Sequence, residues 1–156
     1  MDYPLSNEIP TFDSLEYDMD VQEDMLALTE EVKDIVESKK KLPLLIDSRV
    51  HERYLGEVEP IDRIAGHIPG AINKVWDGSL QKGSFKNSDK QKERFSDFDT
   101  DEPIIVYCGS GVSATPNYIA LKMAGFKNVK LYAGSYSDWI SYEDNEVETK
   151  IETKGD

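Results

Sequence analysis

The chain has 156 residues, which is enough for one domain of ordinary size with a single core and too few for two full domains. Acidic residues outnumber basic ones by 31 to 18, and the formal net charge of −13 disfavours nucleic acid and anionic membranes as partners. A single cysteine excludes an internal disulfide, and because the two histidines lie far from it in the sequence, no structural zinc site is expected.

Residues 1–25 are acidic and show no clean helical or strand period. The start of the chain has neither the basic region nor the apolar core of a signal peptide, and no segment is long enough to span a bilayer, so a cytoplasmic, reducing compartment is the default. We expect an extended acidic arm or interdomain linker. It is either disordered or packed along a domain surface, because it carries Tyr3, Leu5, Ile9, Phe12, Leu15 and Tyr17.

The domain is expected to begin near residue 26 with a helix and a buried strand. Thr29 is a candidate N-cap, and an apolar stripe follows it in the helix. Residues 44–46 form an unbroken apolar run, which is typical of a central parallel strand. Asp47 and Arg49 stand just after this run, where they would brace the floor of a site at the strand end.

Residues 50–64 are polar and too irregular for one element, and they carry Arg53 and Arg63. Arginines in such a loop could simply be solvated among acidic neighbours. The run Gly-His-Ile-Pro-Gly-Ala at 66–71 leads into a short strand at 72–75, and its His67 is a candidate general base.

The next residues predict a loop and then a short helix at 88–95, with Phe85 and Phe95 as core anchors. A second apolar strand follows at 104–107 and ends at Cys108. The turn after it contains Gly109 and Gly111, and residues 115–124 predict a helix. Strand, glycine-rich turn and helix N-terminus would direct backbone N–H groups at the thiol and favour its reactive thiolate form. A lone cysteine in this setting could equally be a small buried hydrophobe.

Residues 129–132 predict a further strand, and Gly134 opens a last short helix in which Trp139 belongs to the core. From residue 143 to 156 charge and threonine dominate, so a disordered tail is expected. The order of elements predicts an α/β domain at 26–142 with a mainly parallel central sheet and helices on both faces. Its active site should lie at the carboxyl ends of the strands.

Four motifs occur in the order in which they occur in the rhodanese superfamily of sulfurtransferases. They are Asp47-Ser48-Arg49, the histidine run at 66–71, Cys-Gly-Ser-Gly-Val-Ser-Ala at 108–114 and Gly-Ser-Tyr-Ser-Asp-Trp at 134–139. The cysteine loop resembles that of 3-mercaptopyruvate sulfurtransferases, with Ser113 where a threonine is usual. Tyr136 and Asp138 replace the more usual tryptophan and glutamate. The resemblance spans roughly residues 26–142 and is to the second, catalytic half of tandem sulfurtransferases, so a preceding inactive rhodanese-like domain is a possible partner.

The resemblance implies a role for each candidate residue. Cys108 would carry sulfur as a persulfide, and Ser110 would either help to move a proton or simply fit the turn. Arg53, and less directly Arg63 in a loop one residue longer than usual, would hold the donor's carboxylate and carbonyl. Asp47, Arg49 and His67 would be structural supports. The loop contacts to substrate sulfur would come from Gly109, Gly111, Val112 and Ser113.

The implied activity is sulfur transfer from a small-molecule donor, 3-mercaptopyruvate, to a thiol acceptor or cyanide, and this reaction needs no cofactor. Thiosulfate is an alternative donor, although enzymes that prefer it usually carry basic residues after the cysteine, where this chain has Gly109 and Ser110. Related phosphatases close the loop with an arginine, and none occurs between Cys108 and Lys122. A non-enzymatic persulfide carrier or binding module is the third alternative.

Overall fold

The computed structural model describes residues 4–20 and 22–150, and its domain is built on a five-stranded sheet with the order β1-β7-β6-β2-β3. All four strand pairings are parallel. The strands are β1 (Leu26–Ala27), β2 (Leu44–Asp47), β3 (Ile72–Asn73), β6 (Ile104–Tyr107) and β7 (Val129–Tyr132). In the register, Asp47 lies opposite both Asn73 and Tyr107, so the carboxyl ends of β2, β3 and β6 meet at one edge of the sheet.

The helices are α1 (Thr29–Glu37), α2 (His51–Leu55), α3 (Ser88–Arg94), α4 (Thr115–Ala124) and α5 (Ser135–Trp139). Two 3₁₀ turns, η1 (Glu23–Met25) and η2 (Trp76–Ser79), and a hairpin of β4 (Leu80–Gln81) and β5 (Ser84–Phe85) complete the domain. The predicted order of the four central strands and of the other four helices is therefore correct, whereas α2, β1 and the β4–β5 hairpin were not predicted, and residues 50–64 were expected to be irregular throughout. Each of these missed strands has only two residues, too few to show a period.

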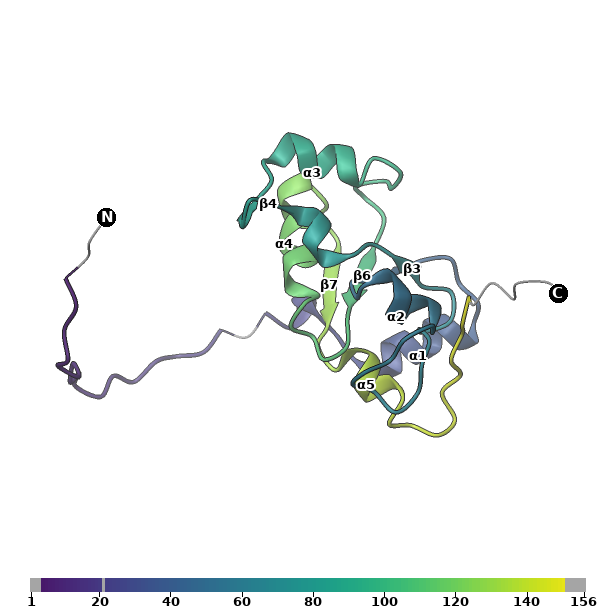
Figure 1. Ribbon diagram of the computed structural model, residues 1–156, viewed down its shortest axis with the longest axis horizontal. Helices are drawn as coiled ribbons and strands as arrows, with labels where there is room; N and C mark the ends of the chain where they lie inside the picture. The colour runs from purple at the N-terminus through teal and green to yellow at the C-terminus, as the bar shows by residue number, and fades with distance from the viewer. Residues whose placement is uncertain (1–3, 21, 151–156) are drawn as a thin grey trace.

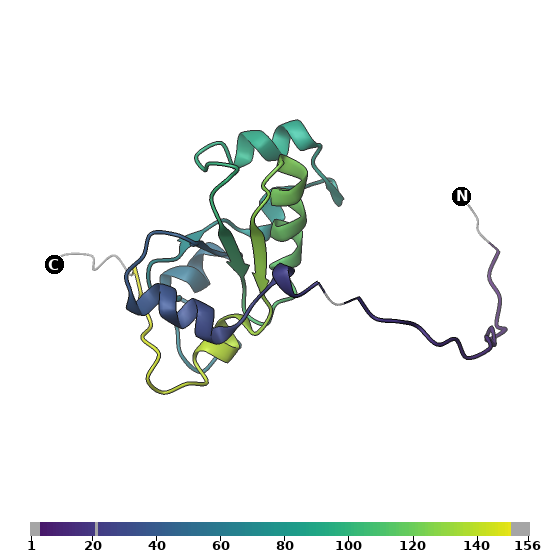
Figure 2. The ribbon, with the colours of Figure 1, turned by 180° about the vertical axis from the view of Figure 1, so that it is seen from behind.

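Alternating side chains of the central strands divide the core into two layers, because successive residues of a strand point to opposite faces. Leu45 and Ile105 pack with residues of α1 and α5 on one face. Ile46 and Val106 pack with residues of α4 on the other, and Cys108 belongs to this second layer. Figures 1 and 2 show α1 and α5 together on one side of the sheet and α3 and α4 on the other. The predicted α/β architecture with helices on both faces is confirmed.

Two local predictions were wrong. Thr29 is the first residue of α1 and not its cap, because its hydroxyl donates to Asp138 Oδ2 at 2.6 Å. Phe85 is 40% exposed in the hairpin, whereas Phe95 is buried, so only the latter anchors the core. Trp139 is buried as predicted.

The segment after α5 is ordered up to residue 150, contrary to the tail predicted from residue 143. Glu148 and His67 exchange both backbone hydrogen bonds, at 2.8 and 2.9 Å, and Val147 packs against the core. Trp139 Nε1 also donates to the carbonyl of Glu146. Charge and threonine content misled the prediction because this segment is held mainly by its backbone. The rest of the predicted tail, 151–156, lies outside the described residues.

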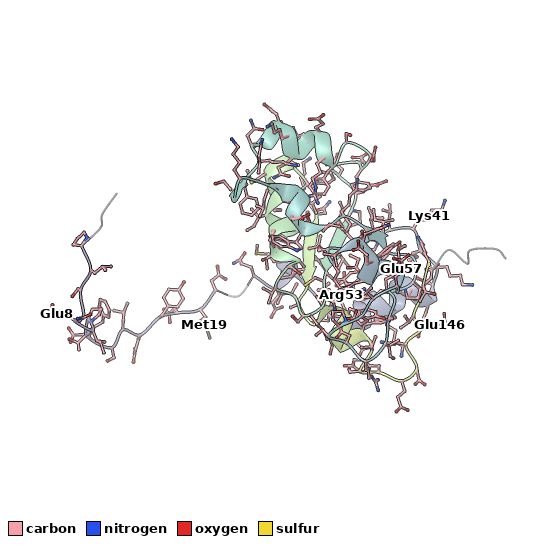
Figure 3. The ribbon with its side chains drawn as sticks, viewed as in Figure 1. Glu8, Met19, Lys41, Arg53, Glu57 and Glu146 are labelled. Carbon is pink, nitrogen blue, oxygen red and sulfur yellow. The ribbon has the colours of Figure 1, made fainter. Side chains whose placement is uncertain are left out.

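Residues 4–20 form an extended, exposed arm that runs away from the domain (Figure 1). Glu8 and Met19 mark its course in Figure 3. Its large apolar side chains, such as Leu5 and Phe12, are exposed by 80% or more, so the alternative in which the arm packs on its own domain is not what the structure shows. Within the described residues, no helix is long and apolar enough to cross a membrane.

Candidate active site

Cys108 directly follows β6, whose four residues are all buried, and it is itself only 1% exposed. The loop that follows it, 108–114, leads into α4. Gly111 has φ +83°, and a Cβ at this position would lie 2.4 Å from the carbonyl oxygen of Ala133. Only glycine fits a positive φ and so close a backbone approach. The loop is therefore folded tightly against the connection between β7 and α5.

The start of α5 fixes the main chain around the cysteine. The N–H groups of Tyr136 and Ser137 donate to the carbonyls of Cys108 and Gly109, at 3.0 and 2.9 Å. The N–H of Cys108 donates in turn to the Ser135 hydroxyl at 3.1 Å. Ser135 itself has φ +57°, which costs free energy for a residue with a side chain. The loop carbonyls thus accept hydrogen bonds from a helix that begins 27 residues after Cys108.

The backbone N–H groups of the loop remain available as donors. Within the described part of the chain, no N–H from residue 109 to residue 114 donates to a protein acceptor. Ser110 and Val112 are exposed, Gly109 and Ser113 are half-buried, and Gly111 is buried. A thiolate or another anion at the cysteine would find these donors together with the N-terminus of α4.

Arg53 projects from α2 to the cysteine loop. A Cβ added to Gly109 would lie 3.6 Å from both terminal nitrogens of Arg53. Its Nε and Nη2 donate to the two carboxylate oxygens of Glu59, at 3.1 and 2.7 Å, and Nη2 also donates to Asp62 Oδ2 at 2.9 Å. Arg53 thus lies beside the cysteine loop, as the sequence predicts. It belongs to α2, which is labelled in Figure 1, and Arg53 itself is labelled in Figure 3.

Asp47 and Arg49 form a fully buried ion pair below this site, with Nη2 and Oδ2 2.6 Å apart. Arg49 also donates to Glu59 and to the carbonyl of Gly66, and its guanidinium lies 4.0 Å above the ring centre of Tyr136. Burial lowers the pKa of Arg49, but the hydrogen bond and the charge of Asp47 more than compensate and raise it. The pair therefore stays charged and ties the end of β2 to the histidine run and to α5.

Glu59 connects the two arginines. Burial raises the pKa of its carboxyl, but hydrogen bonds from Arg53 and from the N–H groups of Asp62 and Ile61 outweigh that effect and lower it. It is therefore an anion that holds Arg49 and Arg53 at a fixed separation.

Arg63 lies elsewhere. It is exposed, and its Nη2 donates to the carbonyl of Ile140 just after α5. In this structure its guanidinium is thus engaged at the far end of α5, whereas Arg53 is engaged at the cysteine loop. The extra loop residue noted in the sequence is consistent with this difference.

His67 is completely buried, with Nδ1 2.6 Å from the carbonyl oxygen of Tyr54 and its ring stacked on the Tyr54 ring at 3.9 Å. Burial lowers the pKa of its imidazole. The nearest carboxylate is that of Glu148, 3.7 Å from Nε2. These surroundings are those of a structural histidine that joins the end of α2 to the C-terminal segment.

Four residues of the site escaped the sequence analysis: Glu59, Asp62, Ser135 and Ser137. The first lies in a Glu-Pro pair and the two serines in the motif at 134–139, so these had a sequence signal as motif members. The side chains and backbone groups that these four residues contact could not be predicted from the sequence. A separate hollow of about 910 Å³ lies between η1, α1 and Pro43. None of its lining residues belongs to the cysteine loop at 108–114 or to the segment at 51–66 that carries Arg53.

The chain is similar to a known protein family and to several curated proteins. The family model described as "Rhodanese-like domain" matches residues 28–142. A Pseudomonas aeruginosa protein named "Probable 3-mercaptopyruvate sulfurtransferase" is 46% identical over 101 residues, which cover 62% of this chain and 36% of the relative. A Mycobacterium tuberculosis protein named "Putative thiosulfate sulfurtransferase SseB" is also 46% identical over 101 residues, covering 62% of this chain and 35% of the relative.

Among solved structures, Tum1 protein from Saccharomyces cerevisiae is similar with a TM-score of 0.73 and 27% sequence identity. The similarity covers 83% of this chain and 48% of that one. The matched part of this chain spans about a third of the length of the Pseudomonas aeruginosa and Mycobacterium tuberculosis relatives.

Proposed function

The chain belongs to the rhodanese-like domain family, and from that premise we propose that it is a sulfurtransferase that moves a sulfane sulfur from 3-mercaptopyruvate through a Cys108 persulfide to a thiol or cyanide. The observation that carries the proposal is that the only cysteine, Arg53 and a row of loop N–H groups with no acceptor among residues 4–20 and 22–150 meet at one place. The names of the relatives support the reaction class, and they divide between two donors.

In the first half of the reaction, the Cys108 thiolate attacks the sulfur of the donor. The new S–S bond forms as the C–S bond breaks, and the electron pair of that bond leaves on pyruvate as its enolate, which takes a proton. In the second half an acceptor thiolate attacks the outer sulfur of the persulfide. That sulfur leaves with the acceptor, and the Cys108 thiolate is restored.

The loop amides supply the electrostatic part of this mechanism. The N–H groups of Gly111, Val112 and Ser113 would stabilise the sulfur anion before and after transfer, because preorganised donors need no rearrangement when charge develops. We assign the transfer of a proton to the leaving group to Ser110, whose side chain is exposed. A resident cofactor has no step in this scheme.

Arg53 is the residue that we assign to the donor's carboxylate. Its Nη1 makes no hydrogen bond within the described residues, and it faces the cysteine loop. A guanidinium can align a planar carboxylate in a way that an ammonium cannot. Arg63 could take part only if it left the carbonyl of Ile140.

Turnover of the purified chain on two donors tests the proposal. With cyanide as acceptor, we expect 3-mercaptopyruvate to be used with the higher kcat/KM and thiosulfate to be used poorly, and Cys108→Ser to abolish both. A preference for thiosulfate would replace the donor assignment. Turnover that appears only with a partner protein would instead support the persulfide carrier.

We further propose a reducing, cytoplasmic setting, which would supply thiol acceptors, and a preceding rhodanese-like domain as a partner. The second of these is testable, because supplying such a domain in trans should raise the turnover of this chain. Full activity with no response to the added domain would contradict it.

A further inference from the structure

Asp62 contacts Arg53 close to the cysteine loop. Its Oδ2 accepts a hydrogen bond from Arg53 Nη2 at 2.9 Å, and a Cβ added to Gly109 would lie 3.9 Å from the same oxygen. Its Oδ1 accepts from the Ser137 hydroxyl at 2.6 Å, and the side chain is only 6% exposed. A carboxylate of the protein thus lies beside the arginine, at the same point of the cysteine loop.

The arginine has two edges that can bind a carboxylate with two parallel hydrogen bonds. Glu59 occupies the edge formed by Nε and Nη2. The remaining edge is formed by Nη1 and Nη2, and Asp62 already takes its Nη2. A donor carboxylate can therefore bind this edge through both nitrogens only after Asp62 has released it.

The balance of charge around Arg53 also favours the release of Asp62 when an anion binds. Three carboxylates, those of Asp47, Glu59 and Asp62, are linked by ion pairs to only two guanidinium groups, those of Arg49 and Arg53. An added anion would meet an excess of negative charge in a partly buried site, where charges are weakly screened. Displacement of Asp62 from the arginine would reduce that excess at the point of contact.

We propose that Asp62 is a built-in competitor for the donor's carboxylate, which occupies Arg53 in the free protein and is displaced when the donor binds. This competition rests on the proposed function, and it makes Asp62 a specificity-determining residue. A ligand whose carboxylate can bind both terminal nitrogens of Arg53 displaces it, and a weaker anion does not.

Ser137 determines how firmly Asp62 is held. Its hydroxyl anchors Asp62, and its backbone N–H anchors the carbonyl of Gly109. Replacing the hydroxyl leaves the backbone contact intact but frees one oxygen of Asp62. Ser137→Ala should therefore weaken the competitor without altering the charge of the site.

Calorimetric titration with pyruvate tests the competition, because pyruvate carries the carboxylate and carbonyl of the proposed donor but no sulfur to transfer. We expect Asp62→Asn to bind pyruvate roughly tenfold more tightly than the wild type, since the competing charge is gone. Ser137→Ala should show a smaller gain. In turnover, the KM for 3-mercaptopyruvate should fall in Asp62→Asn by more than the KM for thiosulfate.

Glu57→Gln is the matched control, because Glu57 is an exposed carboxylate of the same segment whose side chain has no hydrogen bond or ion pair within the described residues (Figure 3). It removes the same charge and should leave pyruvate binding unchanged. Equal or weaker pyruvate binding by a folded Asp62→Asn variant would overturn the proposal and make Asp62 a support for Arg53. If that variant does not fold, Ser137→Ala decides by the same criterion. Pyruvate binding does not depend on Cys108, so this result is separate from any failure of sulfur transfer.

Discussion

The two segments that form the site, the cysteine loop at 108–114 and the arginine segment at 51–66, are held by different forces. The cysteine loop is fixed through its backbone by hydrogen bonds from α5 and by a glycine that touches another main chain. The arginine segment is fixed by side-chain charges, among which Glu59 joins two arginines. The first arrangement leaves amide donors free for an anion, and the second leaves a guanidinium already occupied by anions of the protein.

The difference has a consequence for function. A loop shaped by backbone contacts presents the sulfur in one geometry whatever the ligand, because nothing in it has to be displaced. A guanidinium held by exchangeable carboxylates can discriminate between ligands, because each must compete with them. We therefore assign the chemistry to the first segment and the choice of donor to the second.

The largest effect is expected from breaking the charge network at its buried base. Asp47→Asn removes the nearer of the two carboxylates that pair with the buried Arg49 and leaves only Glu59, and we expect a loss of about 3–5 kcal/mol in the free energy of unfolding. Chemical denaturation measures it. The control is Asp97→Asn, which removes an exposed pair with Lys74 and should cost less than about 1 kcal/mol. Equal losses in both variants would mean that the network does not hold the segment.

The cysteine loop is tested by Gly111→Ala. The added methyl group would collide with the carbonyl of Ala133 and shift the loop, so we expect kcat/KM to fall about 100-fold. Gly83→Ala is the control, because Gly83 has a similar φ of +77° with nothing within 4 Å of a Cβ. It should show the cost of the backbone conformation alone, with normal turnover. Normal turnover in Gly111→Ala would contradict the backbone account of the loop.

The arginine segment is tested by Arg53→Lys, which keeps the charge and loses the planar fork. For 3-mercaptopyruvate we expect kcat/KM to fall about tenfold or more, equal to ~1.4 kcal/mol. Thiosulfate has no carboxylate to align, so its turnover should fall less. Steady-state kinetics with both donors measure the ratio, and equal losses would show that Arg53 braces the loop and does not select the donor.

The smallest effect concerns pH. Burial keeps the pKa of His67 below the 6.5 of a free imidazole, so the unfolded chain takes up the proton first as the pH falls. The contribution of this group to stability is therefore complete above pH 6.5 and is lost as the pH falls from there through the folded pKa. His67→Gln should flatten the dependence of the unfolding free energy on pH in that range. An unchanged slope would show that His67 does not titrate on unfolding.

Much of the fold and of the candidate site could be predicted from the sequence because the informative signals are local. An apolar run ending in a cysteine, with glycines and then a helix, indicates a strand, a loop and their junction within a dozen residues. Arg53 and Cys108 were likewise found through motifs. The closeness of Arg53 to Gly109 follows once both segments are placed at the same edge of a parallel sheet.

The rest depends on partners that are distant in the sequence. Nothing in the order of residues indicates that Asp62 accepts from Ser137, 75 positions later, or that Arg63 binds the carbonyl of Ile140. The C-terminal segment was missed for the same reason, because its pairing with His67 uses main-chain groups that every residue has. Composition predicts the burial of side chains and gives no information about such backbone pairing.

The central claim, that Cys108 carries the transferred sulfur, is tested most directly by the mass of the intact protein after incubation with 3-mercaptopyruvate without an acceptor. We expect the mass to rise by that of one sulfur atom, the addition to map to Cys108, and a thiol or cyanide to remove it. Cys108→Ser should show no addition, because the chain has no other cysteine. Turnover of the donor by Cys108→Ser, or a wild-type protein that turns over without ever carrying the added sulfur, would contradict the account.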